Sequence, residues 1–583
     1  MVRVTYEKEQ PVISGEQYRL TCMADRPFVL LSDAKGERLA QLFVPSSVHP
    51  LQGRDDTVEV GEWTVRELES EMVLELRARS SVWEEKVYRF RCQSQRFSYE
   101  IEVVGQGHLA EAHYFGGYYS GNLRWGSGFF PSGQSFEKGF NPEPNTDEIN
   151  HFSPSEGSVI DITGVPLPGR GDWFFTPPPF SFAFKGPNGW MGMSVEAPAG
   201  ANRFAEYRYT GQRGAFYLTL DYEGHTRVDG RYRLPAIGFD FGESEYEVLE
   251  KHVGALREAG YVPQGREGKT PDWWREPIFC GWGSQCHVAR TEAGAPSAFA
   301  RQHHYDQFLE TLSRNDVVPG IVVIDDKWQE SYGENAVDEA KWPDLRGWVD
   351  GQHAAGRKVL LWLKAWDPEG VPADECIRNA AGMPVSVDPT NPAFERRLRA
   401  SVRQMLSADG YDADGFKIDF SARIPSGPGM QLYGGAWGLE LVKIYLGIIY
   451  DEAKRAKPDA LIMTHTPHPC LADVLDMIRL NDINTGTDIP VAMMHRARVA
   501  AIACPEALID TDNWPITDRA TWRTYVGLQT ALGVPSLYYS SHVDTTGEPL
   551  EEEDYERIRQ LWAAYRGVGG AHSRAEMQEK ESR

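Results

Sequence analysis

Short runs of alternating apolar and polar residues recur along the first 240 or so positions of the chain. Among them are TVEVGEWTVRELE (57–69), VLELRARS (73–80), KVYRFRCQ (86–93) and FSYEIEVVG (97–105), with Gly, Pro, Asp and Asn between the runs. A period of two turns one face of a strand toward a core and the other toward water. Many short strands separated by turn residues are typical of a β-sandwich. We therefore predict a β-sandwich domain over residues 1–245.

The pattern changes after this domain, where a segment with helical spacing leads into a polar stretch, and we predict a helical linker over residues 246–275. From residue 276 onward, apolar runs of strand length alternate with segments of helical spacing. The apolar runs are 277–284, 320–326, 358–366, 413–420, 460–466, 477–482, 506–514 and 534–541. The helical segments are 305–315, 345–356, 393–410, 437–456, 518–533 and 552–567.

Eight strands with crossover helices predict a (β/α)8 barrel over residues 276–567. A doubly wound sheet is the alternative architecture. The last residues, 568–583, are polar and charged, and we expect them to be disordered.

Two aromatic segments rich in Gly and Pro interrupt the sandwich pattern. HYFGGYYSGNLRWGSGFFPSG (113–133) and GDWFFTPPPF (171–180) are too broken for core strands, so we predict long loops. They would either cap the mouth of the barrel or pack between the two domains.

Composition and charge narrow the choice of partners. The chain has 583 residues and a formal net charge of −24, which argues against nucleic acid, whose phosphates require a basic face. Its seven cysteines are scattered and form no CxxC pair, so we expect neither a disulfide framework nor a zinc ribbon. The sequence begins without a signal segment and has no long apolar run, which predicts a cytoplasmic protein outside membranes.

Charged residues and tryptophans gather where the predicted barrel strands end, which is where such barrels place their active sites. A single aspartate there is as often a helix N-cap. The repetition at nearly every strand end, together with carboxylates and tryptophans, is instead typical of a site that cleaves sugars. In strand order these residues are Asp325, Asp326, Lys327, Trp328; Trp362, Lys364, Trp366, Asp367; Lys417, Asp419; His465, His468; Arg479, Asp482; and Asp510, Asp512, Trp514.

Four segments resemble motifs of the α-galactosidase-like clan of glycoside hydrolases (clan D), chiefly family 36 and its raffinose-synthase relatives. IVVIDDKWQ resembles the paired-aspartate motif after the second strand, and DGFKID resembles the K-x-D nucleophile motif. FCGWGSQ resembles the end of the first strand, and MIRLNDIN resembles the segment that carries the acid/base. The four follow one another in the order of that family, and the resemblance covers most of residues 276–567.

The resemblance implies a retaining α-glycoside hydrolase that acts on an α-galactoside-like or modified α-glycoside without a cofactor or metal. Asp419 would be the nucleophile that forms a covalent glycosyl-aspartate, and Asp482 the general acid/base. For Arg479 a buried ion pair is the favoured role. The candidates for substrate binding are Asp325, Asp326, Lys417, Trp328, Trp362, Lys364, Trp366, His465, Arg479 and Asp512.

The sequence departs from the family pattern at several points. Lys327 replaces the usual glycine after the paired aspartates, Asn481 stands where serine is common, and HTPHPC replaces a segment rich in Cys and Gly. The last predicted barrel helix nearly ends the sequence, so we expect no counterpart of the family's usual C-terminal β domain. Lys327, His465 and His468 would add positive charge, which makes a modified or anionic sugar an alternative to a plain α-galactoside. Asp510 and Asp512 are rival candidates for the acid.

Other functions remain open at this point. Attack by a second sugar instead of water would make the protein a transglycosylase. A metal-dependent barrel hydrolase would use His465, His468 and carboxylates as ligands. A protein that binds oligosaccharide without cleaving it is a further alternative. Relatives often assemble, so a homo-oligomer is plausible.

Overall fold

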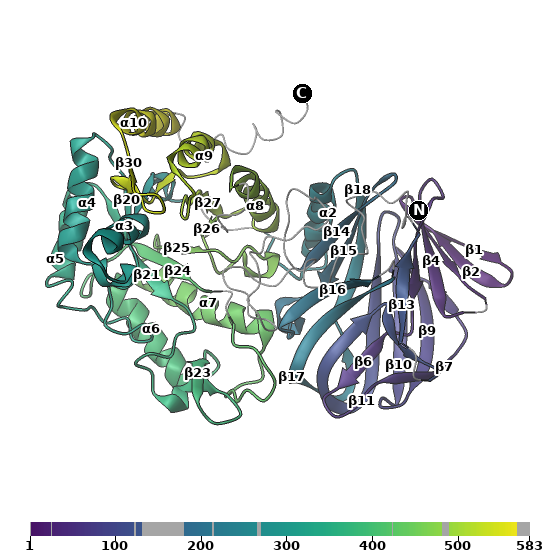
Figure 1. The fold of residues 1–583 in the computed structure, drawn as a ribbon. Helices are drawn as coiled ribbons and strands as arrows, with labels where there is room; N and C mark the ends of the chain where they lie inside the picture. The colour runs from purple at the N-terminus through teal and green to yellow at the C-terminus, as the bar shows by residue number, and fades with distance from the viewer. Residues whose placement is uncertain are drawn as a thin grey trace.

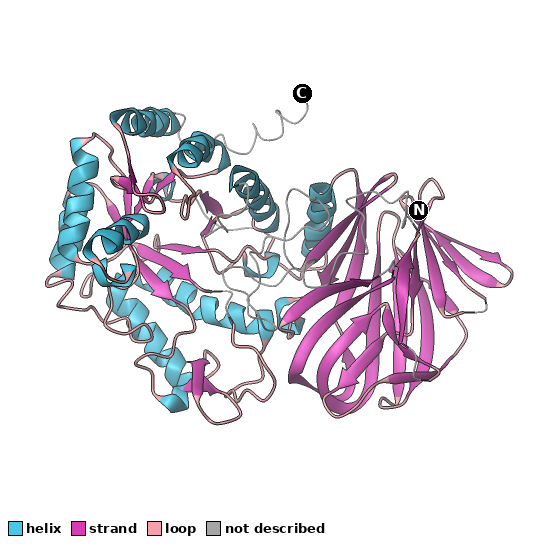
Figure 2. Cartoon of the chain, viewed as in Figure 1, coloured by secondary structure: helices cyan, strands magenta, loops and turns pink. Residues whose placement is uncertain are grey.

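The computed structural model describes residues 2–24, 26–121, 124–130, 180–212, 215–264, 270–421, 424–480 and 489–567. A strand-rich N-terminal part lies beside a barrel with helices on its outer face (Figure 1, Figure 2). The predicted fold class, a β-sandwich followed by a (β/α)8 barrel, is confirmed. The predicted tail over 568–583 and residues 171–179 of the second aromatic segment lie outside the described residues. Among the described helices, none combines the length and apolarity needed to cross a bilayer.

The N-terminal sheet is almost wholly antiparallel, and its longest strands, β11 and β17, pair over most of their length. Its inner faces enclose a core of aromatic and branched side chains. Its strands are β1 Arg3–Glu7, β2 Gln10–Ser14, β3 Tyr18–Cys22, β4 Phe28–Asp33, β5 Arg38–Phe43, β6 Ser47–Pro50, β7 Asp56–Val60, β8 Thr64–Glu67, β9 Met72–Ser80, β10 Glu85–Cys92, β11 Phe97–Tyr114, β12 Gly116–Tyr119, β13 Arg124–Phe129, β14 Ser181–Gly186, β15 Gly189–Glu196, β16 Glu206–Gln212, β17 Ala215–Arg233 and β18 Ala236–Gly242.

The first aromatic segment, predicted as a loop, instead contributes strands to this sheet. It holds the end of β11 and the paired strands β12 and β13. The glycines that suggested a loop mark close approaches between strands. A Cβ atom on Gly117 would lie 2.4 Å from Ser47 Oγ, and one on Gly116 would lie 2.5 Å from Tyr217 Cβ. Glycine is therefore required here by packing and not by a turn.

The barrel strands run parallel in the order β27-β26-β25-β24-β21-β20-β19-β28, and each lies within one of the eight predicted runs. A bridge between Asp510 and Val534 closes the barrel, with Val534 N–H donating to Ile509 O at 2.7 Å. The strands are β19 Ile278–Cys280, β20 Ile321–Ile324, β21 Lys358–Lys364, β24 Gly415–Asp419, β25 Leu461–Thr464, β26 Met477–Arg479, β27 Leu508–Asp510 and β28 Ser536–Leu537.

Helices cover the barrel, two short hairpins lie in its connections, and 3-10 turns occur in both the sandwich and the barrel part of the chain. The helices are α2 Glu245–Glu258, α3 Trp282–Glu292, α4 Gln302–Arg314, α5 Leu345–Ala354, α6 Pro392–Leu406, α7 Gly438–Ala456, α8 Ile489–Ala503, α9 Arg519–Leu532 and α10 Glu552–Gly567. The hairpin strands are β22 Cys376–Arg378 with β23 Pro384–Val387, and β29 His542–Val543 with β30 Glu548–Pro549. The 3-10 turns among the described residues are η1 Ala199–Ala201, η2 Asp272–Arg275, η3 Pro296–Phe299, η4 Ala373–Glu375 and η5 Pro469–Leu471.

Two helices differ from the sequence prediction. The first strand was expected to reach residue 284, but the chain turns into α3 at Trp282. Helix α8 was not predicted, because its apolar residues are spread around the helix and give no amphipathic stripe. It lies between α2 and α9, where both sides are covered (Figure 1).

The sandwich and the barrel meet at the start of α7. Trp437 stacks on His225 of β17 with ring centroids 3.7 Å apart, and its indole N–H donates to Glu223 at 3.2 Å. Next to it, Gly438 approaches the sandwich so closely that a Cβ atom would lie 2.0 Å from the Phe204 carbonyl oxygen. Since α7 is the helix that follows β24, the sandwich holds the element behind the predicted nucleophile.

Candidate active site

Lys417 and Asp325 form a buried ion pair inside the barrel. Lys417 Nζ lies 2.6 Å from Asp325 Oδ2, and both side chains are 3% exposed. The thiol of Cys280 donates to the same oxygen at 3.0 Å. Burial favours the neutral form of Lys417, but the carboxylate of Asp325 outweighs it and holds the pKa of Lys417 above its usual value. The lysine is therefore charged, and Asp325 neutralises it.

Asp419 ends β24 inside a ring of donors. Its Oδ1 accepts from Arg479 Nη2 at 3.1 Å and from the N–H of Phe420 at 2.9 Å, while Trp362 Nε1 donates to Oδ2 at 3.1 Å. His465 Nε2 lies 3.1 Å from Oδ1. Burial alone would raise the pKa of Asp419, but the charge of Arg479 and the contact with His465 hold it well below its usual value. Asp419 is therefore a carboxylate at any working pH.

Arg479 connects this carboxylate to a second one. Its Nη1 pairs with Asp512 Oδ2, while its Nη2 reaches Asp419, and the guanidinium is 1% exposed. Asp512 is fixed in turn because its Oδ1 accepts from Trp514 N–H at 2.9 Å. The two carboxylates and one guanidinium leave a net charge of −1. Arg479 thus lies inside the barrel as an ion pair, and Asp512 is the second carboxylate partner of this pair.

The two histidines of HTPHPC occupy different environments. His465 contacts Asp419, and burial lowers its pKa to about 4 even against that carboxylate. His468 lies away from the site, where its ring contacts Phe180 and its Nδ1 accepts from Cys470 N–H at 3.1 Å. Burial lowers the pKa of His468 to about 3. Both rings are neutral near pH 7, so the expected positive charge from them is wrong.

Asp326 and Tyr332 form one wall near the barrel mouth. Tyr332 donates its hydroxyl to Asp326 Oδ1 at 2.8 Å, and its ring centroid lies 4.2 Å from the ammonium group of Lys327 and 4.3 Å from that of Lys364. Lys327 pairs with Glu369 at 2.6 Å and therefore adds no unpaired charge, contrary to the sequence-based expectation. Desolvation raises the pKa of Asp326 to about 7, and the Tyr332 hydrogen bond only partly opposes it.

Lys364, a predicted substrate-binding residue, is held by a neighbouring carboxylate. Its Nζ lies 2.8 Å from Asp367 Oδ2, three residues further along the chain. The side chain is half-buried at the end of β21, beside Tyr332.

Only one of the three tryptophans expected to line a sugar pocket touches the predicted nucleophile. That residue is Trp362, through its indole N–H. Trp328 is completely buried behind it and donates to the Trp362 carbonyl oxygen at 2.8 Å. Trp366 stacks on Tyr445 of α7 with centroids 4.6 Å apart, and it donates to Ser421 O at 2.8 Å. Trp328 and Trp366 therefore pack behind the site, a correction to their predicted role as pocket walls.

The predicted acid/base Asp482 and its neighbour Asn481 lie outside the described residues. The rival Asp510 is 1% exposed and pairs in register with Arg479 across β26 and β27. Burial, and next the charge of Asp512, raise the pKa of Asp510 to about 7. Its carboxyl group lies inside the barrel with little contact to solvent.

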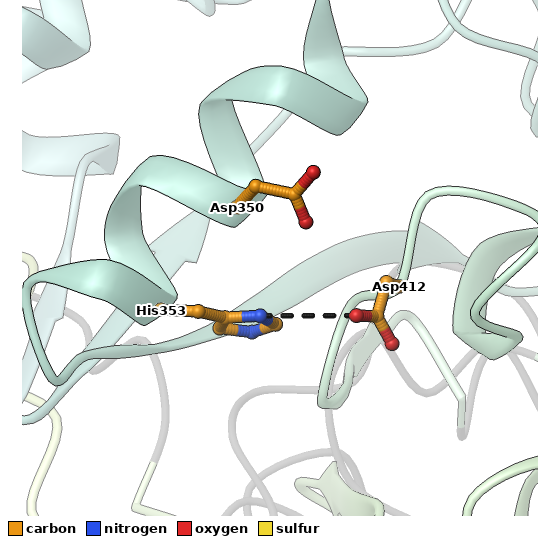
Figure 3. A group of neighbouring side chains, drawn as sticks. All are labelled: Asp350, His353 and Asp412. Carbon is orange, nitrogen blue, oxygen red and sulfur yellow. Dashed lines mark ion pairs between the residues drawn. The ribbon is translucent and has the colours of Figure 1, made fainter.

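A possible metal-ligand group lies at the opposite end of the barrel. Among the described residues, Asp350, His353 and Asp412 bring donor atoms within 4.8 Å of one another (Figure 3). These donors already have partners. Arg346 pairs with Asp350 at 2.9 Å, and Lys457 pairs with Asp412 at 2.8 Å. His353 belongs to the helix before β21 and Asp412 precedes β24, so this group lies at the amino ends of the strands, away from Asp419.

Reasoning from the sequence singled out Trp514 near the barrel mouth but missed Tyr332, Trp282 and Tyr538. Tyr332 lies in a connection with no motif of its own. Trp282 and Trp514 approach edge to face with centroids 5.6 Å apart, and both are half-buried at the carboxyl ends of β19 and β27. Trp282 belongs to FCGWGSQ and Trp514 follows Asp512, so their positions after barrel strands were the available signal. The ammonium group of Lys417 lies 5.0 Å from the ring centroid of Tyr538. No pattern in the sequence indicates this contact, because it depends on how the chain folds.

The raised pKa of Asp326 predicts a pH-dependent stability. The folded protein keeps this proton up to about pH 7, whereas the unfolded chain releases it near its ordinary value of 3.8. The stability contributed by Asp326 is therefore complete below pH 3.8 and is lost as the pH rises through about 7. Asp326→Asn should gain stability relative to the wild type between these limits, by up to about 4 kcal/mol.

Urea unfolding of the two proteins at mildly acidic and mildly alkaline pH measures this difference. Asp473→Asn, at an exposed carboxylate on the barrel surface, is the matched control and should show little change with pH. The prediction would be contradicted if Asp326→Asn and the wild type differed in their free energy of unfolding by the same amount at both pH values.

No family model and no curated protein matches this chain. Solved structures do resemble it. A family 31 sulfoquinovosidase from E. rectale, in complex with the aza-sugar inhibitor IFGSQ, aligns with a TM-score of 0.54 and 12% identity, covering 97% of this chain and 82% of that one. An uncharacterized Listeria monocytogenes EGD-e protein in complex with glucose, magnesium and calcium aligns with a TM-score of 0.50 and 12% identity.

The Listeria alignment covers 96% of this chain and 54% of that one, so the chain spans about half the length of that protein. An α-galactosidase from Thermus thermophilus in complex with stachyose aligns with a TM-score of 0.46 and 14% identity, over 86% of this chain and 99% of that one. At such identities the first two similarities concern architecture. The chain has a sandwich-and-barrel fold that glycoside hydrolases also use.

Proposed function

We propose that this protein is a retaining α-glycoside hydrolase, a divergent relative of family 36, in which Asp419 forms a covalent glycosyl-aspartate. The observation that carries the proposal is the environment of Asp419. A carboxylate at the carboxyl end of the fourth barrel strand is kept ionised by Arg479 and oriented by Trp362 and the Phe420 N–H. A nucleophilic carboxylate needs this combination of charge and fixed direction.

The electrostatics of the site suit the transition state of glycoside cleavage. Cleavage develops positive charge on the sugar ring. The group of Asp419, Arg479 and Asp512 carries a net charge of −1 in a buried setting, where interactions between charges are stronger than in water. Ionisation of Asp326 above about pH 7 would add to this negative potential.

The pairing of cations favours a neutral sugar. The described cations around the site already have carboxylate partners: Lys417 has Asp325, Arg479 has Asp419 and Asp512, Lys364 has Asp367, and Lys327 has Glu369. An anionic substituent would have to displace one of these carboxylates. A neutral, α-galactoside-like sugar can instead donate its hydroxyl protons to Asp325 and Asp326, and accept from the Lys417 ammonium group.

We assign the acid/base role to Asp482 because of the order of the motifs along the chain. It follows β26, as in the family the sequence resembles. Asp512 is bound to Arg479 and serves as an acceptor, while Asp510 is only 1% exposed. A general acid must reach the leaving oxygen, a need that the Arg479-bound Asp512 and the buried Asp510 meet poorly.

Transfer to a second sugar is the alternative outcome of the same intermediate. The edge-to-face pair of Trp282 and Trp514 supports it, since half-buried indoles near the barrel mouth can hold an acceptor sugar. Hydrolysis and transfer then differ only in whether water or a sugar hydroxyl attacks the glycosyl-Asp419 ester.

Asp419→Asn should reduce turnover of aryl α-glycosides by about 10⁴-fold, because an amide cannot serve as the nucleophile. The assay compares galactoside, glucoside, N-acetylgalactosaminide and sulfonated or carboxylated glycosides, and we expect the galactoside to be the best substrate. Asp473→Asn serves as the control and should retain full turnover, since Asp473 is exposed on the barrel surface. Undiminished turnover by Asp419→Asn would remove Asp419 as the nucleophile.

The turnover lost in Asp482→Ala should depend on the leaving group of the substrate, as expected when a general acid is removed. Turnover of a phenyl glycoside should fall by about 10²-fold to 10⁴-fold. A dinitrophenyl glycoside, whose leaving group needs no proton, should be affected much less in the step that forms the glycosyl-enzyme. Azide should restore turnover and give a glycosyl azide of retained configuration. The same pattern in Asp512→Asn, with Asp482→Ala unaffected, would transfer the role to β27.

A further inference from the structure

A cleft in the N-terminal sandwich lies apart from the barrel site. It has a volume of about 320 Å³, at the lower end of the range typical of small-molecule sites. It opens between the β4–β5 turn, the β14–β15 turn and the first two turns of α2. Leu39, Met191 and Phe241 form a buried apolar floor. The half-buried Trp190 forms the aromatic part of the lining.

Two glycines of the cleft lining, Gly189 and Gly242, lie next to Trp190 in the sheet. The partner of Trp190 across β15 and β18 is Gly242, which presents no side chain to the indole. The neighbouring Gly189 has φ +143°, and a Cβ atom there would lie 2.7 Å from the Gly242 carbonyl oxygen. A larger residue at either position would meet the opposite strand or Glu247 and narrow the cleft.

One wall of the cleft is a prearranged polar network. The side chain of Asn188 donates to Asp33 Oδ2 at 2.7 Å and accepts from Lys35 Nζ at 3.2 Å. Asp33 Oδ1 accepts from the backbone N–H groups of Lys35 and Glu37, both at 2.9 Å, which fixes the β4–β5 turn. Two turns more than 150 residues apart in the sequence are thereby locked together. Amide, carboxylate and ammonium groups are held in place before any ligand arrives.

The opposite wall comes from the start of α2. Lys251 Nζ pairs with Glu247 Oε1 at 2.7 Å and donates to Phe241 O at 2.6 Å. Glu247 Oε2 accepts from the N–H of Glu243 at 2.7 Å. Both ammonium groups of the cleft, Lys35 and Lys251, thus have partners within the protein. The three carboxylates, Asp33, Glu243 and Glu247, outnumber them.

We infer that this cleft is a second carbohydrate-binding site, which holds a neutral oligosaccharide with one sugar ring against Trp190. A pyranose ring has an apolar face for the indole and hydroxyl groups around its edge for the Asn188 amide and the carboxylates. The excess of carboxylates disfavours an anionic ligand. The site goes beyond the proposed hydrolase reaction, because it does not depend on Asp419 or on the sugar that the barrel cleaves.

The test measures binding of stachyose and maltopentaose by calorimetry to the full chain carrying Asp419→Asn, which prevents turnover of either probe. Adding Trp190→Ala should weaken binding of at least one probe about tenfold or more. Asn188→Ala should weaken the same binding. Because Asn188 is at an exposed turn position, this variant tests the site even if Trp190→Ala has a folding defect. Trp63→Ala, which removes another half-buried tryptophan of the sandwich, is the control and should leave binding unchanged.

Three results would overturn the inference. The first is that the full chain with Asp419→Asn alone, the parent of the other variants, binds neither probe at millimolar concentration. The second is that Trp190→Ala and Asn188→Ala bind as tightly as the parent, or that Trp63→Ala loses as much. The third is that an oligogalacturonate binds more tightly than both neutral probes, since an anionic ligand is the one this cleft should reject.

Discussion

The candidate active site depends on a buried arginine between two buried carboxylates. Asp419 could not remain ionised inside the barrel without a compensating charge, because burial alone favours its protonated form. Arg479 supplies that charge, and Asp512 in turn fixes the other side of the guanidinium. The group as a whole remains negative, so compensation does not cancel the potential that a developing oxocarbenium ion requires.

The rest of the fold serves to keep these three groups in register. Arg479 pairs in register with Asp510 on the next strand, and the Asp510–Val534 bridge then closes the barrel. On the other side, Trp362 pairs with Lys417 across β21 and β24 and reaches Asp419 with its indole N–H. A shift of one residue in any of these strands would turn the charges out of the barrel. The sandwich adds rigidity through Trp437, at the start of the helix after β24.

Much of this architecture could be predicted from the sequence, because apolar runs and motif order are local features. All eight barrel strands lie in predicted runs. Prediction failed where local features mislead: the glycines of β12 and β13 reflect strand contacts, and α8 is apolar around its circumference. In the site, residue types at strand ends were readable, but their partners were not. Neither the burial of Trp328 nor the pairing of Lys327 with Glu369 follows from spacing, since both depend on how connections fold over the barrel.

The most direct test of the central claim is to identify the residue that carries the sugar. The protein would be incubated with a glycosyl fluoride that carries a fluorinated form of the sugar in its best substrate. Such a reagent forms a glycosyl-enzyme that hydrolyses slowly. The labelled protein would then be digested and analysed by mass spectrometry. The account predicts one sugar per chain, attached to Asp419 and absent from Asp419→Asn. A sugar attached to Asp326 or Asp512, or rapid turnover of the substrate with no labelled carboxylate, would contradict it.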